Sequence, residues 1–141
     1  MLISYFSEAR NAVADGAREI DMVISIGALK SGDYAYVFDE IKQVVSESQG
    51  YPVKVIIETV FLSDEEKIAA SFIAASAGAK FVKTCTGFLG GGATVDDVAL
   101  IKRTVSNDGV KVRVKASGGI RNFDKCLEML NAGADRIGSY V

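Results

Sequence analysis

A short unit of helix, tight glycine turn and strand recurs along this chain, and it limits the folds that the chain can adopt. The turn occurs three times, as Asp15-Gly16-Ala17, Ala77-Gly78-Ala79 and Ala132-Gly133-Ala134. Glycine commonly closes a helix because it adopts a left-handed backbone without strain, and each of these turns precedes a β-prone run. Helices and strands that alternate about every 28 residues are typical of a parallel sheet.

The pattern predicts five strands in one domain of 141 residues, residues 1–141, with no linker. Helices are expected over residues 3–14, 32–47, 63–77, 94–106 and 122–131. Strands are expected over residues 19–25, 53–58, 81–83, 110–115 and 135–140. Ser63 and Glu66 have the spacing of a capping box, in which each side chain bonds the other residue's backbone amide.

The side chains of the expected strands alternate between an apolar and a charged face. In residues 53–58 valine and isoleucine hold the odd positions, while Lys54 and Glu58 fall on the other face. In residues 110–115 three valines alternate with three basic residues. A barrel has helices outside and a lumen that can be polar near its mouth, so the alternation favours a partial (βα)₈ barrel. An open sheet with water on one face would show the same alternation.

Four charged residues share the face that would line this lumen: Asp21, Lys54, Lys83 and Lys115. Lys83 and Lys115 both stand near the carboxyl ends of their strands, where parallel sheets place their ligands. Bringing an amine from its usual pKa of about 10.4 to neutrality takes about 4 to 5 kcal/mol. A second cation at about 5 Å supplies roughly 3 kcal/mol, and burial can supply the rest. The sequence therefore predicts that Lys115 keeps Lys83 free of its proton.

A neutral lysine amine in a sheltered site can attack a carbonyl and form a Schiff base. The protonated imine acidifies the adjacent carbon, so that a carbon–carbon bond can be made or broken. Asp21 and Lys115 are the candidates for moving the protons. The alternative for each lysine is a solvated side chain at a strand end. Lys54 lies early in its strand, so we expect a structural role for it.

Glycine-bearing loops follow both lysine strands and the last strand. Thr86 and Gly87 come after Lys83, Gly118 and Gly119 come after Lys115, and the pair 138–139 (Gly138 and Ser139) ends the final strand. These loops offer backbone amides with little steric obstruction, and helix N-termini attract anions. We expect these six residues to bind the substrate, and a phosphate group would suit them.

The composition excludes several other chemistries. The chain has no histidine and two cysteines, which rules out common zinc spacings and histidine-based catalysis, so no metal or other cofactor is expected. Cys85 is expected to be a small packing residue rather than a reactive thiol, and Cys126 a core residue. Acidic and basic residues nearly balance, at a net charge of −2, which argues against nucleic acid and membranes as partners. The cytoplasm is the expected location.

Several segments closely resemble the deoxyribose-phosphate aldolase family: residues 19–24, 27–34, 53–59, 81–88, 91–95 and 115–121. The resemblance implies a class I aldolase on a (βα)₈ barrel that reversibly joins acetaldehyde and glyceraldehyde 3-phosphate without a metal. It implies that Lys83 is the Schiff-base lysine and that Asp21 and Lys115 form the proton relay. It also implies that Gly118, Gly119 and the 138–139 region contact phosphate.

The chain departs from the family pattern in three ways. It supplies five strands, which resemble the fourth to the eighth of the family's barrel. Cys85 stands where the family usually has serine, and Tyr140 stands where a phosphate-binding serine is expected. Unpaired barrel edges favour a homo-oligomer. The first hypothesis is thus an aldolase, as part of a longer protein or as subunits that complete each other. An inactive partial barrel that serves as an assembly module is the second, and another phosphosugar enzyme the third.

Overall fold

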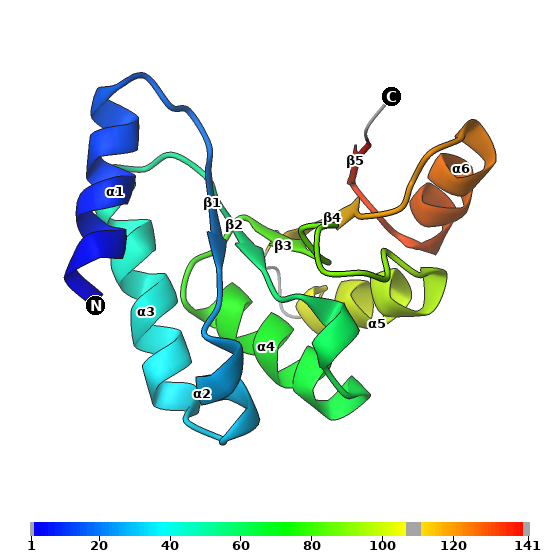
Figure 1. Cartoon of the computed structure of the whole chain (residues 1–141), viewed down its shortest axis with the longest axis horizontal. Coiled ribbons are helices and arrows are strands. Elements are labelled where there is room, and N and C mark those ends of the chain that lie inside the picture. Colours follow the sequence, from blue (N-terminus) through cyan, green and yellow to red (C-terminus); the bar gives the residue numbers. More distant parts are fainter. Residues whose placement is uncertain (1, 107–110, 140–141) are drawn as a thin grey trace.

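The computed structural model describes residues 2–106 and 111–139, with side chains from Ser7 onward. One sheet of five parallel strands, in the order β1-β2-β3-β4-β5, organises the chain (Figure 1). The strands are β1 (Ile20–Val23), β2 (Val53–Ile56), β3 (Phe81–Lys83), β4 (Arg113–Ser117) and β5 (Arg136–Gly138). The helices are α1 (Leu2–Ala14), α2 (Ile26–Lys30), α3 (Tyr34–Glu47), α4 (Asp64–Ser76), α5 (Val95–Val105) and α6 (Phe123–Ala132), with a 3-10 turn, η1 (Thr59–Phe61).

The expected helix starts are confirmed by their caps. Ser63 accepts the amide of Glu66, whose carboxylate accepts the amide of Ser63, so the capping box is complete. Thr94 and Asn122 cap α5 and α6 in the same way, each accepting a backbone amide three residues on. Helix α2 and turn η1 were not predicted, because they are too short for a 3.6-residue apolar period to show.

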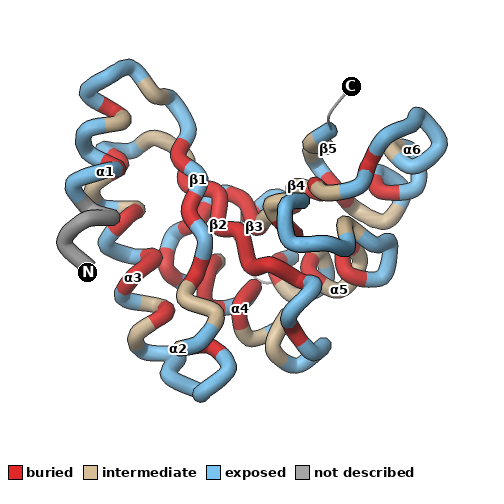
Figure 2. The backbone as a smooth tube through the Cα atoms, in the orientation of Figure 1, coloured by how far each residue is buried: buried red, intermediate tan, exposed pale blue. Residues whose placement is uncertain are grey.

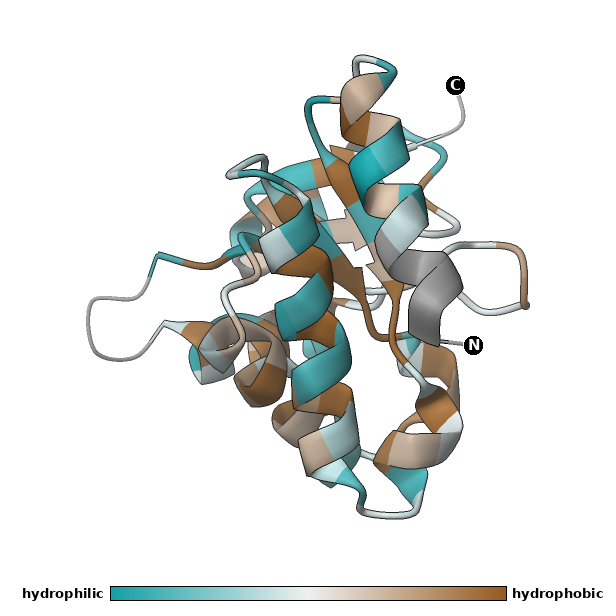
Figure 3. Ribbon diagram, turned by 90° about the vertical axis from the view of Figure 1, so that its left-hand side faces the viewer, coloured by the Kyte–Doolittle hydropathy of each residue, from teal (hydrophilic) through white to brown (hydrophobic). Residues whose placement is uncertain are grey.

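The apolar core lies between the sheet and the helices, which follow one another along one side of it (Figure 1). In β1 the burial alternates: Ile20 and Met22 are buried on the helix side, and Asp21 and Val23 are exposed on the other. Buried residues gather in the central strands β2 and β3 (Figure 2). Figure 3 shows strands that mix hydrophobic and hydrophilic residues, behind helices that carry hydrophilic residues outward. The predicted two-faced strand is confirmed in β1, whereas all four residues of β2, Lys54 included, are buried.

An ion pair between the two edge strands shows how strongly the sheet curves. Arg136 of β5 donates from Nη1 to both carboxylate oxygens of Glu19, just before β1, at 2.9 Å each. In a flat sheet, strands four steps apart would be about 19 Å from each other. The sheet therefore wraps around its charged face as part of a barrel, and the flat open sheet is excluded.

Within residues 2–106 and 111–139, no helix has the length and apolar character needed to cross a bilayer.

Candidate active site

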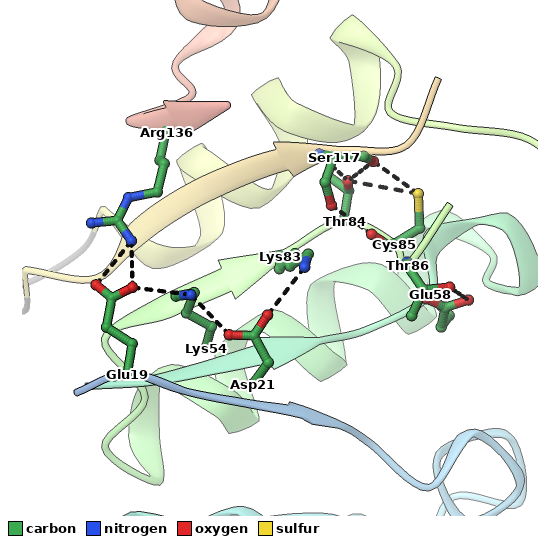
Figure 4. A network of polar contacts seen from close by, with 10 residues as sticks. All are labelled: Glu19, Asp21, Lys54, Glu58, Lys83, Thr84, Cys85, Thr86, Ser117 and Arg136. Atoms are coloured by element: carbon green, nitrogen blue, oxygen red, sulfur yellow. Dashed lines mark hydrogen bonds and ion pairs between the residues drawn. The ribbon is translucent and has the colours of Figure 1, made fainter. Parts of the chain in front are cut away.

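A chain of alternating charges runs across the concave face of the sheet (Figure 4). Arg136 binds Glu19, whose carboxylate also lies 3.1 Å from the Nζ of Lys54. Lys54 in turn lies 2.8 Å from Asp21, and the other oxygen of Asp21 lies 3.1 Å from the Nζ of Lys83. Asp21 therefore accepts one lysine on each oxygen, and its carboxylate is fixed between them.

The pairing of strands puts Lys54 level with Asp21, which gives Lys54 its expected structural role. Its side chain is only 9% exposed. Burial opposes its charge, but the hydrogen bonds to Asp21 and Glu19 outweigh burial and raise the pKa of Lys54. Burial by itself would raise the pKa of Asp21, but the hydrogen bonds from Lys54 and Lys83 lower this pKa overall. Lys54 thus helps to keep Asp21, a candidate for proton transfer, in its ionised form.

Lys83 and Lys115 are direct neighbours across β3 and β4, as expected. Burial, followed by the charges of Lys83 and Lys54, lowers the pKa of Lys115. Lys83 itself is ion-paired with Asp21. Burial and nearby cations therefore push Lys115, the residue expected to act on Lys83, toward neutrality. The lowered pKa thus belongs to Lys115, which was expected to serve in the proton relay. The loss of the proton from Lys83 remains a prediction.

Replacing Lys115 with methionine is expected to stabilise the fold by up to about 1 kcal/mol at pH 7. The folded pKa lies below the ordinary 10.5, so the unfolded chain binds more protons between the two values and stability rises with pH there. The advantage of methionine should shrink as the pH approaches 10.5. Urea unfolding of both chains from pH 7 to 10 measures it, with exposed Lys111→Met as the control. A gain that stays constant with pH would contradict the argument.

A cleft of about 190 Å³ opens where the strands end. Its lining comprises Lys83, Thr86, Gly87, Ser117, Gly118, Gly119, Ile120, Arg121, Gly138 and Ser139. All six expected substrate contacts are thus brought together beside Lys83. Asp21 and Lys115 are not among the lining residues. Asp21 is linked to the cleft by its ion pair with Lys83, and Lys115 is the neighbour of Lys83 across β3 and β4. Tyr140 lies outside the described residues.

Sequence reasoning missed three residues that line the cleft: Ser117, Ile120 and Arg121. Arg121 could have been noticed as a cation two residues beyond the Gly118-Gly119 pair. Ser139 was expected to bind the substrate, but its hydroxyl donates to the carbonyl of Ile120 at 2.7 Å.

Cys85 packs against the first glycine of the 118–119 loop. A Cβ on Gly118 would lie 2.5 Å from the Cys85 sulfur, and the φ of Gly118 is +96°, so this position needs glycine. The Cys85 thiol is 1% exposed and donates to the carbonyl of Ser117 at 2.9 Å. Burial raises the pKa of this thiol. The packing role expected for Cys85 is confirmed.

Side chains tie the carboxyl ends of β3 and β4 to each other. The Thr84 hydroxyl donates to the Ser117 carbonyl at 2.8 Å and accepts the Ser117 amide at 3.1 Å. The Ser117 hydroxyl donates to the carbonyl of Cys85 at 2.5 Å. These buried bonds hold the strand ends that carry Lys83 and Lys115 in fixed relation.

Glu58 is a buried carboxylate at the end of β2 that sequence reasoning placed on the charged face without a role. Its backbone is left-handed, with φ 55° and ψ 64°, a conformation that costs a non-glycine residue about 1–3 kcal/mol. Its carboxylate accepts the amide of Thr86 at 2.5 Å and the hydroxyl of Thr86 at 3.3 Å (Figure 4). Glu58 therefore holds a residue that lines the cleft.

Comparison with known proteins supports one family. The model of the DeoC/LacD family aldolases matches residues 2–139. The deoxyribose-phosphate aldolase of Carboxydothermus hydrogenoformans is 58% identical over 136 residues. A candidate deoxyribose-phosphate aldolase from Coccidioides immitis superposes with a TM-score of 0.96 at 40% identity, over 99% of this chain and 55% of its own. The deoxyribose phosphate aldolase of Aeropyrum pernix, described as tetrameric, gives 0.87 at 30% identity, over 99% of this chain and 58% of its own.

The matches are longer than this chain. The alignment with the Carboxydothermus hydrogenoformans protein takes in 94% of this chain and 58% of that protein. The chain thus spans less than two thirds of the curated relatives it matches.

Proposed function

The chain belongs to the DeoC/LacD family of aldolases, and from that premise we propose that Lys83 is its Schiff-base lysine. The reaction is the reversible cleavage of 2-deoxyribose 5-phosphate to acetaldehyde and D-glyceraldehyde 3-phosphate. One observation carries the proposal: Lys83 is the amine among the lining residues of the glycine-walled cleft, and its Nζ lies 3.1 Å from Asp21. An amine at the mouth of a parallel sheet, beside a carboxylate, suits imine formation.

The reaction starts when the Lys83 amine adds to the aldehyde carbon of the open-chain sugar. The carbinolamine loses water, and a protonated imine remains. A base then takes the proton of the hydroxyl on the third carbon. The bond between the second and third carbons breaks, its electron pair forms the enamine, and D-glyceraldehyde 3-phosphate leaves. Protonation of the enamine carbon and hydrolysis of the imine release acetaldehyde and restore Lys83.

Two neighbours of Lys83 supply the proton transfers in this proposal. Asp21 stays ionised because its pKa is lowered, so it can take a proton from Lys83 or from a water molecule. Lys115 exchanges its proton more readily than an ordinary lysine because its own pKa is lowered. Asp21 acts through its ion pair with Lys83, and Lys115 lies level with Lys83 on the neighbouring strand.

We propose that the phosphate binds at the glycine loops of the cleft. Gly118, Gly119, Gly138 and Arg121 all belong to its lining. Arginine and unobstructed amides are groups that bind phosphate well. Thr86 and Gly87 then remain for the sugar carbons between the phosphate and the imine.

A second candidate is an inactive partial barrel that serves in assembly. Strands β1 and β5 are the two edges of the described sheet, and the chain spans 58% of its Carboxydothermus hydrogenoformans relative. Water entering the concave face would screen the charges around Lys83. Pairing of these edges with another copy of the chain would shelter that face, so we propose a homo-oligomer as the active form.

Turnover measured on material of known mass tests the proposal. The purified chain is sized by light scattering, and acetaldehyde release from 2-deoxyribose 5-phosphate is followed on each species. We expect release from an oligomer, with Lys83→Ala inactive in an oligomer of the same mass. An oligomer that folds and releases no acetaldehyde would favour the assembly module. Turnover by a clean monomer would overturn the oligomer proposal alone.

A further inference from the structure

We propose that Glu58 is a positioning residue that sets the direction of the Thr86 hydroxyl in the cleft. The inference rests on the proposed aldolase function and extends it to a residue outside the cleft lining. Glu58 is 1% exposed, so it does not touch a ligand itself. It acts through Thr86, which lines the cleft beside Lys83.

The hydrogen bonds of Thr86 determine what its hydroxyl can offer a ligand. A threonine hydroxyl has one proton and two lone pairs. The carboxylate of Glu58 can only accept, so the hydroxyl donates its proton to Glu58, at 3.3 Å. The amide of Phe88 lies 3.5 Å from the same oxygen and takes one lone pair. The remaining lone pair is what Thr86 presents to the cleft, and a lone pair binds a hydroxyl of the ligand rather than a phosphate or carbonyl oxygen.

The backbone conformation at Glu58 directs this carboxylate toward Thr86. The amides of Ile57 and Thr59, on either side of Glu58, donate to the carbonyls of Lys83 and Thr84 at 3.1 and 3.0 Å. The two donors, Ile57 and Thr59, are two residues apart, whereas the two acceptors, Lys83 and Thr84, are adjacent in the sequence. One extra residue in one of two paired segments is the geometry of a bulge. Bulges redirect a side chain next to functional sites. Here the extra residue is Glu58, in a left-handed conformation, and its carboxylate meets Thr86.

The Glu58 carboxylate accepts two hydrogen bonds from Thr86, and a purely structural role would need only one of them. The bond from the Thr86 amide at 2.5 Å is enough to hold the loop to β2. The second bond, to the hydroxyl, changes nothing in the backbone and only fixes a proton. Glutamine at position 58 separates the two roles. Its carbonyl would still accept the amide, but its NH₂ would donate to the hydroxyl oxygen and turn the Thr86 proton toward the cleft.

The test is Glu58→Gln in the full chain, alone and combined with Thr86→Val. Binding of 2-deoxyribose 5-phosphate is followed by NMR at the amides of Gly118 and Gly119. We expect Glu58→Gln to weaken binding about 10-fold, the effect of one misdirected hydrogen bond. On the Thr86→Val background the same change should weaken binding less than about 2-fold, because no hydroxyl remains to be turned. Glu40→Gln is the control, since Glu40 is also buried and accepts one backbone amide, from Ser25.

Trapping of acetaldehyde on Lys83 with borohydride distinguishes the two proposals. Acetaldehyde has no hydroxyl, so we expect equal adduct in the unchanged chain and in Glu58→Gln. An equal loss of sugar binding with and without the Thr86 hydroxyl would overturn the role of Glu58, as would sugar binding that Glu58→Gln leaves unchanged. Failure of the unchanged chain to bind the sugar would overturn it too. Absence of the acetaldehyde adduct from the unchanged chain would overturn the aldolase function instead.

Discussion

Replacing Lys83 with alanine is expected to lower the rate of retro-aldol cleavage by at least about 10³-fold. Without the amine no imine forms, and the carbon–carbon bond lacks the electron sink that lets it break. The other charges should stay in place, because Asp21 keeps its 2.8 Å contact with Lys54. Release of acetaldehyde from 2-deoxyribose 5-phosphate measures the effect, and the unfolding midpoint in urea shows that the variant folds.

Lys80→Ala is the matched control for this change. Lys80 immediately precedes β3 and is exposed, so its loss removes a lysine from the same segment without touching the cleft. We expect its rate to stay within about 2-fold of the unchanged chain. Turnover that survives in Lys83→Ala would show that another amine carries the chemistry, and Lys115 would be the first to replace.

The change of Asp21 to asparagine should affect both rate and stability. It leaves two poorly exposed ammonium groups, those of Lys54 and Lys83, without this shared carboxylate. Since Asp21 is itself 34% exposed, we expect a loss of about 1–2 kcal/mol in the free energy of unfolding at pH 7. The rate should fall about 10²-fold or more, because a group that moves protons is lost. Urea unfolding and acetaldehyde release measure the two effects.

The pH dependence of this loss has a definite sign. The pKa of Asp21 is lowered in the fold from its ordinary 3.8, so its contribution is complete above that value. It disappears as the pH falls through the lower folded pKa, and the two chains should then unfold at the same urea concentration. The control is Asp39→Asn, at an exposed position of α3. A stability difference that persists unchanged at pH 2 would contradict the ion-pair argument.

Local patterns predicted the five strands, the five longer helices and the two faces of the sheet, but neither α2 nor η1. The caps at Ser63, Thr94 and Asn122 depend on residues three positions apart, which can be read directly from a sequence. Alternation along a strand likewise depends only on neighbours. It placed Asp21, Lys83 and Lys115 on one face, and the order of the strands brought them together.

Features that depend on distant segments could not be predicted in this way. The pair of Glu19 and Arg136 joins residues 117 positions apart, and only the curvature of the sheet brings them together. The hydrogen bonds between Glu58 and Thr86 depend on a bulge, and no residue type in the sequence predicts that bulge. The lowered pKa of Lys115 is of the same kind, because it depends on burial and on the charges of Lys83 and Lys54, which lie on other strands.

Trapping the imine shows directly whether the Lys83 amine reacts with an aldehyde. The chain is incubated with acetaldehyde, reduced with borohydride, digested, and the modified peptide is located by mass. We expect one ethyl group, on Lys83, and none in the Lys83→Ala variant. A label on another lysine, or an equal label in the alanine variant, would contradict this expectation.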